Sequence, residues 1–574
     1  MTTVAENMVA TLAANGVKRV YGLPGDSLNG FTDAIRLDGT IDWVHVRHEE
    51  AAAFAAAGEA DLTGELAVCA ASCGPGNTHL VNGLYDANRS RVPVLAIAAH
   101  IPSSEIGSNY FQETHPERLF AECSVYCELV STPEQMPRLL EIAMRTAIEK
   151  RGVAVLVIPG DLANGSAASE RVTVIRPTRS VVVPEQEELL EAAGILNSGK
   201  NVTILAGAGA SDAHDELIAL ADALGAPIVH ALRGKDGIEY DNPFDVGMTG
   251  LLGFHSGYRA MEACDTLLML GTDFPYQQFY PSKAKIIQVD IRGEQLGRRV
   301  PLDLGLRGTV RDTARALLPL VTRKKKRGHL KDSLAHYAKT RKSLDELATD
   351  KRRSGPMHPQ FITRMVDEAA SDDAVLIPDV GSPTTWAARY LTMNGKRRMI
   401  GSFWHGTMAA ALPQAIGAQA TYPDRQVIAL AGDGGLAMLL GELLTLVQNK
   451  LPVKVIVYNN ASLNFVEVEM KAAGFVNFGT ELTNPNFGDV AEAIGLRGFS
   501  VDKPGDLAKT LAEAFAYDGP ALIDVSAERQ ELSIPPTITL EQMKGFSLYA
   551  LRTVMSGRGD ELFDLAKANV RQLF

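Results

Sequence analysis

Short runs of β-branched and other apolar residues alternate along the chain with longer stretches that are rich in Ala and Leu. The apolar runs Leu66–Ala71, Val202–Leu205 and Val427–Ala431 are each followed by a glycine-containing turn. Unbroken apolar runs of this kind are typical of strands that are buried on both faces, whereas the Ala- and Leu-rich stretches favour helices. The pattern predicts an α/β protein built from doubly wound parallel sheets with helices on both faces.

One order of elements occurs twice along the chain. In each copy we expect a helix, then a strand that ends at a glycine turn, then a second strand opened by an apolar-Pro-Val sequence. The first copy places them at Glu49–Asp61, Leu66–Ala71, Gly74-Pro75-Gly76 and Val92-Pro93-Val94. The second copy places them at Gly406–Ala420, Val427–Ala431, Gly432-Asp433-Gly434 and Leu451-Pro452-Val453. Repetition at so long a period indicates two copies of one domain.

A third unit lies between the two copies. It opens with the strand Val202–Leu205 and is expected to close near Ile286–Asp290. The basic run 323–327 that follows could be a nucleic-acid or lipid patch, but its position between units favours a solvated linker or linker helix. We therefore expect domains at 1–180, 181–340 and 355–530, and a C-terminal tail at 531–574.

Composition narrows the class of protein. The chain has 574 residues, 56 Lys and Arg, 68 Asp and Glu, and a net charge of −12, which argues against a nucleic-acid partner. Its five cysteines include no Cys-x-x-Cys pair, so they predict reduced thiols and no zinc site. The first ten residues do not resemble a signal peptide, and the apolar runs are shorter than the roughly 20 residues that span a bilayer. We expect a cytoplasmic protein.

The clearest chemical signal is Gly432-Asp433-Gly434 followed by Asn460. The glycines allow a strand-to-helix turn to approach a phosphate, and the N-terminus of the helix favours its negative charge. The Asp433 carboxylate and the Asn460 amide oxygen are hard ligands that suit Mg²⁺. Gly-Asp-Gly alone could equally be an ordinary turn, but its spacing to Leu-Pro-Val and Asn-Asn favours a diphosphate site.

This spacing resembles the thiamine-diphosphate signature. The whole chain is similar to the thiamine-diphosphate- and FAD-dependent pyruvate oxidase family, and most of all to its quinone-reducing pyruvate dehydrogenases. The matching stretches are Gly25-Asp26-Ser27-Leu28-Asn29-Gly30, Arg47-His48-Glu49-Glu50, Ser72-Cys73-Gly74-Pro75-Gly76-Asn77, Ile101–Pro116, His230–Asp236, Tyr240–Leu251 and Met393–Ser402. The resemblance implies a pyrimidine-binding first domain, a central FAD-binding domain and a third domain that binds diphosphate and Mg²⁺.

The resemblance also assigns residues to the thiamine diphosphate site. It implies that the carboxyl of Glu49 hydrogen-bonds N1′ of the aminopyrimidine; Glu50 is the rival, and only the register of the motif favours Glu49. It implies that Met408 supports the bent cofactor and that Ser462 joins Asp433 and Asn460 as a metal ligand through its backbone carbonyl. The remaining residues expected to contact this cofactor are Gly25, Gly74, Asn77, Gly432 and Gly434.

Further residues are carried over to the substrate and flavin sites. The implied pyruvate contacts are Phe111, Gln112, Val380, Phe465 and Glu469. The implied FAD contacts are Gly207, Gly209, Arg233, Met248, Thr249, Gly250, Leu251, Gly271, Thr272 and Asp290. Acetolactate synthases have Met and Trp at the positions of Phe465 and Glu469, so both residues favour an oxidase. Asn464 departs from the Gly that relatives usually have, and Asn tolerates left-handed backbone.

The activity implied is oxidative decarboxylation of pyruvate to acetate, with electrons passing through FAD to a membrane quinone, by a homo-oligomer that is at least a dimer and is expected to be a tetramer. The alternatives are an acetolactate synthase, an oxygen-using oxidase that forms acetyl phosphate, and a catalytically silent scaffold or sensor. The segment Gly559–Phe574 has helical spacing of apolar residues. It could dock on its own protein, but the resemblance implies reversible attachment to lipid at the inner face of the cell membrane.

Overall fold

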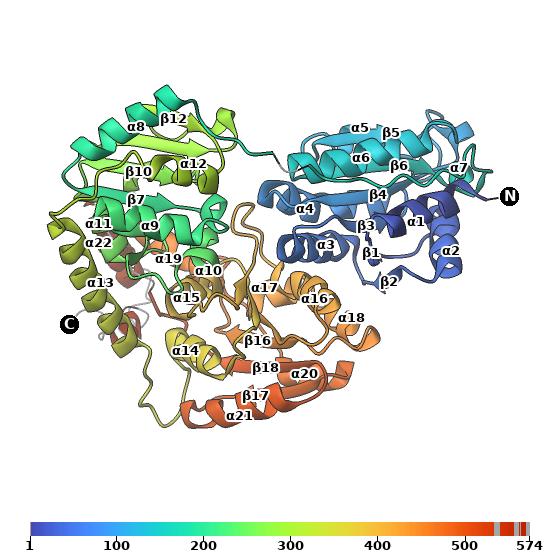
Figure 1. The fold of residues 1–574 in the computed structure, drawn as a ribbon. Coiled ribbons are helices and arrows are strands. Elements are labelled where there is room, and N and C mark those ends of the chain that lie inside the picture. Colours follow the sequence, from blue (N-terminus) through green and yellow to red (C-terminus); the bar gives the residue numbers. More distant parts are fainter. Residues whose placement is uncertain (1, 179, 533–539, 556–561, 563, 570–574) are drawn as a thin grey trace.

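The computed structural model describes residues 2–178, 180–532, 540–555, 562 and 564–569. Three six-stranded sheets, all of parallel strands, lie in the first, central and third parts of the chain, and helices cover them (Figure 1). The predicted α/β class with doubly wound parallel sheets is confirmed.

The first and third domains have the same strand order, β2-β1-β3-β4-β6-β5 and β14-β13-β15-β16-β18-β17. The repeat seen in the sequence is therefore a repeat of topology. The strands and helices of the first domain are β1 Arg19–Gly22, β2 Asp42–His45, β3 Ala67–Ala71, β4 Val94–His100, β5 Tyr126–Leu129, β6 Val153–Pro159, α1 Val4–Ala14, α2 Asn29–Asp38, α3 Glu49–Thr63, α4 Pro75–Ser90, α5 Pro116–Leu119, α6 Met136–Lys150 and α7 Gly160–Asn164. Those of the third domain are β13 Val375–Pro378, β14 Arg398–Met399, β15 Val427–Gly432, β16 Lys454–Asn459, β17 Arg497–Val501, β18 Ala521–Ser526, α14 Pro359–Ala369, α15 Ser382–Tyr390, α16 Ala411–Thr421, α17 Asp433–Met438, α18 Glu442–Gln448, α19 Asn464–Ala472, α20 Phe487–Ile494 and α21 Pro504–Ala516.

The central domain has a different strand order, β12-β11-β10-β7-β8-β9. The domain does not end near Asp290 as predicted, because β12, which follows, is the edge strand of the same sheet, and α12 comes after it. Its elements are β7 Val202–Ala206, β8 Ile228–His230, β9 Asp245–Met248, β10 Thr266–Leu270, β11 Lys285–Asp290, β12 Leu304–Arg307, α8 Gln186–Ser198, α9 His214–Leu224, α10 Lys235–Ile238, α11 His255–Glu262 and α12 Val310–Leu317.

The basic run 323–327 is held against the central domain rather than solvated throughout. Arg323 and Arg327 both form ion pairs with Asp222, at 2.6 and 2.9 Å, and the Lys324 ammonium group donates to the backbone oxygen of Leu196 at 2.8 Å. Helix α13, Gly328–Leu347, begins directly after the run and leads toward the third domain.

The expected helix Gly406–Ala420 begins later than predicted, at Ala411. Residues before it form a loop in which Ala409 has a φ of +70°, a left-handed value that a right-handed helix cannot include. The Asp379 carboxylate accepts a hydrogen bond from the Ala409 N–H at 3.2 Å and helps to hold this turn. Composition alone could not predict the contact with Asp379, which holds the residues before Ala411 in a turn and so sets where the helix begins.

Helices α3 and α16 join the first and third domains through one hydrophobic core that contains residues of both. Their backbones approach closely: a Cβ on Gly417 would lie 2.0 Å from the Ala55 carbonyl oxygen, and one on Gly58 would lie 2.8 Å from that of Gln414. The buried alanines of α3 have the small side chains that this approach requires.

The C-terminal segment contains a helix that the sequence did not predict, α22, Leu540–Met555. It packs on α19, because a Cβ on Gly545 would lie 1.9 Å from the Ala472 carbonyl oxygen. Of the expected helix over 559–574, residue 562 and residues 564–569 are helical, and the other positions lie outside the described residues. Asn569 exchanges hydrogen bonds with the backbone of Gln530 and Leu532, so the described part of this segment is docked on the chain.

No helix among the described residues combines the length and the apolar character needed to cross a membrane.

A buried carboxyl at the junction of the first and third domains makes stability depend on pH. Asp86 accepts hydrogen bonds from the Ser402 hydroxyl at 2.7 Å and the Gln414 amide at 2.9 Å, and burial raises its pKa to about 6. A raised pKa means that the carboxyl stabilises the fold most below its unfolded pKa of 3.8, and this contribution is lost as the pH rises through about 6.

We expect Asp86→Asn to gain stability relative to the wild type by about 1–2 kcal/mol as the pH rises from about 5 to about 8. The new amide does not ionise, and it can donate to the Gln414 oxygen, a buried atom without a hydrogen-bond partner in the structure. Urea unfolding of both proteins at several pH values measures this difference. A difference that does not change with pH would contradict the assignment.

Candidate functional site

Three predicted site residues of the third domain follow the carboxyl ends of adjacent strands. Val380 follows β13, Asp433 follows β15, and Asn460 follows β16. Ligands of open parallel sheets bind at this edge, where helices also begin. The topology therefore brings together residues that the sequence separates widely.

The Asp433 carboxylate lies at the centre of this edge and is 3% exposed. Its Oδ2 accepts from the backbone N–H groups of Ala461 at 2.7 Å and Asn460 at 3.2 Å, and from the Asn484 amide at 2.8 Å. Burial raises the pKa of Asp433, and these donors oppose that effect. Sequence reasoning missed Asn484, which has no motif of its own.

The other predicted residues of this edge lie around Asp433. A Cβ on Gly434 would lie 3.4 Å from the Met408 Cε, so the two are neighbours, and Gly432 ends β15. Ser462 is buried, and its N–H donates to Asn460 Oδ1 at 3.0 Å. The loops after β15 and β16 thus offer the Asp433 carboxylate, the Asn460 amide oxygen and the Ser462 backbone carbonyl. These are oxygen ligands of the kind that Mg²⁺ prefers.

Asp379, which precedes Val380, is a further buried carboxyl that sequence reasoning missed. It is 1% exposed, burial raises its pKa to about 7, and its Oδ1 has no hydrogen-bond partner in the structure. Because it binds the Ala409 N–H, it determines the backbone next to Met408.

The first domain presents a second edge of the same kind. Glu49 begins α3, is buried, and its Oε2 lies 2.8 Å from Nδ1 of His79. A Cβ on Gly76 would lie 3.0 Å from Glu49 Oε1, so this carboxylate lies against the Gly74–Asn77 turn. Glu50 instead accepts from Asn82 at 2.7 Å. Glu49 therefore lies at the glycine turn, whereas Glu50 lies beside Asn82, and the choice between them stays a prediction.

The remaining predicted residues of this edge pack around the glycine turn. Gly74 has a φ of +65° and a Cβ there would lie 2.8 Å from the Gln112 Cβ, while Phe111 is 78% exposed. A Cβ on Gly25 would lie 2.3 Å from the Ser72 hydroxyl. Asn77 is buried and donates to the Ala99 carbonyl at 2.8 Å, and its Oδ1 has no partner in the structure.

Helix α19 carries Phe465 and Glu469 one turn apart, so both lie on one face. Phe465 lies beside the loop after β13, because a Cβ on Gly381 would lie 3.9 Å from the Phe465 Cβ. Partial burial raises the pKa of Glu469, and burial and the charge of Glu469 together raise the pKa of Tyr276 in the central domain. This face of α19 therefore lies between the central domain and the loop of Asn460 and Ser462, called here the metal-type loop.

Asn464 has a positional role that the sequence did not predict. It is not among the residues with positive φ; Ala461, with a φ of +53°, makes the left-handed turn instead. The Asn464 amide donates to the Arg529 backbone oxygen, and its Oδ1 accepts from the Ser382 hydroxyl at 2.9 Å.

The predicted flavin contacts lie at the carboxyl edge of the central sheet. Each of them ends or follows one of five strands. Gly207 and Gly209 follow β7, Arg233 follows β8, and Asp290 ends β11. Met248 ends β9 and is followed by Thr249, Gly250 and Leu251, and Gly271 and Thr272 follow β10. The glycine loops pack against each other, since a Cβ on Gly209 would lie 2.9 Å from the Gly271 Cα. The Thr249 hydroxyl is buried without a partner in the structure.

Comparison with known proteins agrees with this arrangement of three domains. Residues 2–119, 189–317 and 379–525 match the N-terminal TPP binding domain, the central domain and the C-terminal TPP binding domain of the thiamine pyrophosphate enzymes. The chain belongs to the thiamine pyrophosphate enzyme family. Thiamine pyrophosphate is the compound called thiamine diphosphate above.

Three relatives of this thiamine pyrophosphate enzyme are similar over nearly their whole length. The thiamine pyrophosphate-containing protein YdaP of Bacillus subtilis is 39% identical over 100% of this chain and 99% of its own. The pyruvate oxidase of Lactiplantibacillus plantarum is 31% identical over 90% of this chain and 87% of its own. The acetolactate synthase isozyme 1 large subunit of Escherichia coli is 30% identical over 95% of this chain and 98% of its own. The family and the named relatives together indicate an enzyme that acts on 2-oxo acids, but they do not single out one reaction.

The carboxyl edges of the first and third sheets, called here the two thiamine-type edges, hold separate groups of predicted site residues within one chain. Among the described residues, no hydrogen bond or ion pair joins the group Gly25, Glu49, Gly74, Asn77, Phe111 and Gln112 to the group Val380, Met408, Gly432, Asp433, Gly434, Asn460, Ser462, Phe465 and Glu469. Both groups fit the cofactor: the third domain has the oxygen donors for Mg²⁺, and each edge has a buried oxygen, Asn77 Oδ1 or Asp379 Oδ1, without a partner.

The position of Glu49 predicts that Glu49→Gln will slow proton loss from C2 of bound thiamine diphosphate by at least about 10²-fold. The amide keeps the size of the side chain but cannot share a proton with the aminopyrimidine. Hydrogen–deuterium exchange at C2, followed by NMR after acid quench, measures this rate in protein that still binds the cofactor. Glu50→Gln is the matched control and should exchange normally. Slow exchange in the Glu50 variant, with normal exchange in the Glu49 variant, would reverse the assignment.

Proposed function

We propose that the protein is a pyruvate dehydrogenase (quinone), which converts pyruvate, water and an oxidised quinone into acetate, CO₂ and the quinol. The position of α19 is the observation that carries this proposal. One face of the helix adjoins the metal-type loop and the loop after β13, and the charge of Glu469 reaches Tyr276 of the central domain. A substrate on this face would lie next to both the thiamine-type edge and the domain expected to hold flavin.

Bound thiamine diphosphate supplies the electron sink for decarboxylation, and bound FAD accepts two electrons. The chain's own residues would hold and orient the reactants. Asp433, Asn460 and the carbonyl of Ser462 would hold Mg²⁺, and Glu49 would hold and move a proton at N1′ of the aminopyrimidine. Phe465 and Val380 would form a small apolar pocket that suits a methyl ketone, and the Phe465–Glu469 pair is not the Met–Trp pair of acetolactate synthases.

Flavin binding is supported by a cluster of three arginines where the first and central domains meet. Arg91 pairs with Asp273 at 3.0 Å, Arg292 lies 3.7 Å from the same carboxylate, and Arg233 donates to the Ser90 backbone oxygen at 2.9 Å. Burial and the charge of Arg292 lower the pKa of Arg91, as expected where positive groups crowd together. A diphosphate would relieve this crowding, and the buried Thr249 hydroxyl could bind the same ligand.

Oligomeric assembly and membrane association are part of the same proposal. A second copy of the chain would bring the Glu49 edge of one protomer to the Asp433 edge of its partner, in a dimer that is the unit of a tetramer. Helix α22 leaves apolar side chains exposed at Met543, Leu551, Val554 and Met555. We propose that this surface and the tail bind lipid, so that the enzyme reduces a membrane quinone while peripherally bound to the inner face of the cell membrane.

Anaerobic spectroscopy tests the reaction. The purified protein loaded with thiamine diphosphate, Mg²⁺ and FAD should lose its visible flavin absorbance when pyruvate is added, because the two electrons have no other acceptor. The Glu49→Gln variant should bleach at least about 10²-fold more slowly. If the flavin stays oxidised in a fully loaded protein that still consumes pyruvate, the activity is carboligation and the proposal is wrong.

A further inference from the structure

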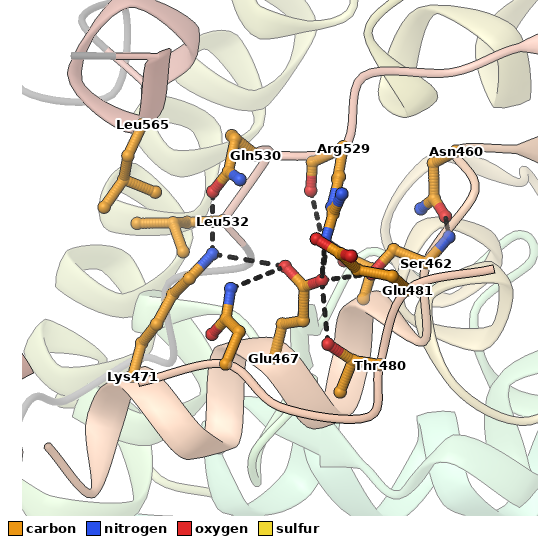
Figure 2. A network of polar contacts seen from close by, with 12 residues as sticks. Asn460, Ser462, Glu467, Lys471, Thr480, Glu481, Arg529, Gln530, Leu532 and Leu565 are labelled. Atoms are coloured by element: carbon orange, nitrogen blue, oxygen red, sulfur yellow. Dashed lines mark hydrogen bonds and ion pairs between the residues drawn. The ribbon is translucent and has the colours of Figure 1, made fainter. Parts of the chain in front are cut away.

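Glu467 of helix α19 is a fully buried carboxylate, 0% exposed, and hydrogen-bond donors surround both of its oxygens (Figure 2). Oε1 accepts from the Ser462 hydroxyl at 2.5 Å, the Thr480 hydroxyl at 3.1 Å and Arg529 Nη2 at 2.6 Å. Oε2 accepts from the Asn477 amide at 3.1 Å and lies 3.5 Å from the Lys471 ammonium group. None of the sequence motifs includes this residue.

The network is complete enough to keep a buried charge in place. A buried carboxylate without partners is strongly disfavoured, whereas one with a cation on each side and hydrogen bonds to its lone pairs is retained. Lys471 also donates to the Gln530 side-chain oxygen at 2.7 Å, and Arg529 donates through Nε as well, at 3.2 Å. Because each partner restricts the same carboxylate, Glu467 has one orientation, and the elements that supply the partners are held relative to it.

One element held in this way is α19 itself. Residues four apart share a helical face, so Glu467 and Lys471 lie on one face and Phe465 and Glu469 lie on another. The first face is buried, and the second carries the two residues proposed to contact the substrate. Glu467 therefore determines the rotation of α19 about its axis, and with it the direction of the two substrate-facing side chains.

The second element is the loop that carries the proposed metal ligands. The hydroxyl of Ser462 is bound by Glu467, while its N–H donates to Asn460 Oδ1 at 3.0 Å. The next N–H, of Leu463, donates to the Thr480 backbone oxygen at 2.8 Å, and Thr480 is itself a partner of Glu467. Of the two loop residues expected to bind Mg²⁺, the carboxylate thus contacts Ser462 directly and reaches Asn460 through Ser462.

We propose that Glu467 is a positioning residue that sets the metal loop and the substrate-facing side of α19 together. It touches neither the metal nor the substrate, and acts through Ser462 on the first and through the helix on the second. This inference rests on the proposed function for the identities of Mg²⁺ and pyruvate, but its residues and contacts are independent of which 2-oxo acid reaction the enzyme performs.

The test compares Glu467→Gln with Glu481→Gln. Glutamine keeps the volume and one acceptor oxygen but turns an amide group toward donors, and it removes the charge that balances Lys471 and Arg529. Glu481 pairs with the same arginine at 3.4 Å, but its side chain is exposed, so its variant is the matched control. The Mg²⁺ concentration for half-maximal binding of thiamine diphosphate should rise about 10-fold or more in Glu467→Gln, as for other residues that support metal ligands.

Two further measurements separate positioning from general destabilisation. The KM for pyruvate should rise in Glu467→Gln while bound FAD stays stoichiometric, and Glu481→Gln should stay within about twofold of wild type in both readouts. Ser462→Ala, which keeps the backbone carbonyl, should reproduce the Mg²⁺ effect without the change in KM. In the double variant the two Mg²⁺ effects should not add, because both act through one contact.

Each result decides the matter. A folded, FAD-containing Glu467→Gln protein with wild-type Mg²⁺ requirement and KM would overturn the inference, as would a loss of thermal stability with both values unchanged. If Glu467→Gln does not fold, Ser462→Ala decides: a normal Mg²⁺ requirement there excludes the link. A wild-type protein that binds thiamine diphosphate without Mg²⁺ would instead contradict the proposed function.

Discussion

The close crossing of α3 and α16 is the contact on which the arrangement of the first and third domains within one chain depends. Glycine at Gly58 and Gly417 lets the two backbones meet, and a side chain at either position would collide with the opposite carbonyl. Each helix begins at one of the two thiamine-type edges, since Glu49 is the first residue of α3 and the loop of Met408 leads into α16. Packing at the middle of the helices therefore fixes where the two edges of one chain lie relative to each other, and in the proposed dimer each edge would face the other kind of edge on the partner.

Buried carboxyls divide into two kinds in this structure. Asp86 and Asp379 accept hydrogen bonds from neutral donors, and burial raises their pKa values to about 6 and about 7. Burial alone would also raise the pKa of Glu467, but Arg529, Ser462 and Lys471 outweigh it and hold the pKa below its usual value. The first kind joins domains or supports a turn, and the second holds a charge beside the proposed metal loop. The two cations that pair with Glu467, Lys471 and Arg529, account for the difference.

Much of the fold could be predicted from the sequence because its signals are local. Apolar runs and glycine turns placed the strands, and the repeated order anticipated the repeated topology of the first and third sheets. Partners that are distant in sequence could not be predicted in the same way. The start of α16 depends on Asp379, and His79 and Asn484 contact site residues from outside the motifs. The packing of α22 on α19 joins segments that are distant in sequence. That Glu49 and not Glu50 lies against the glycine turn is likewise visible only in three dimensions.

Product analysis tests the central claim most directly, because oxidative decarboxylation to acetate and carboligation to acetolactate give different products. The loaded enzyme should be incubated with ¹³C-labelled pyruvate and a soluble oxidant, and the products followed by NMR. We expect labelled acetate and CO₂ in equal amounts, with one two-electron equivalent of oxidant reduced for each pyruvate consumed. Acetolactate as the main product, with the oxidant unchanged, would contradict the account.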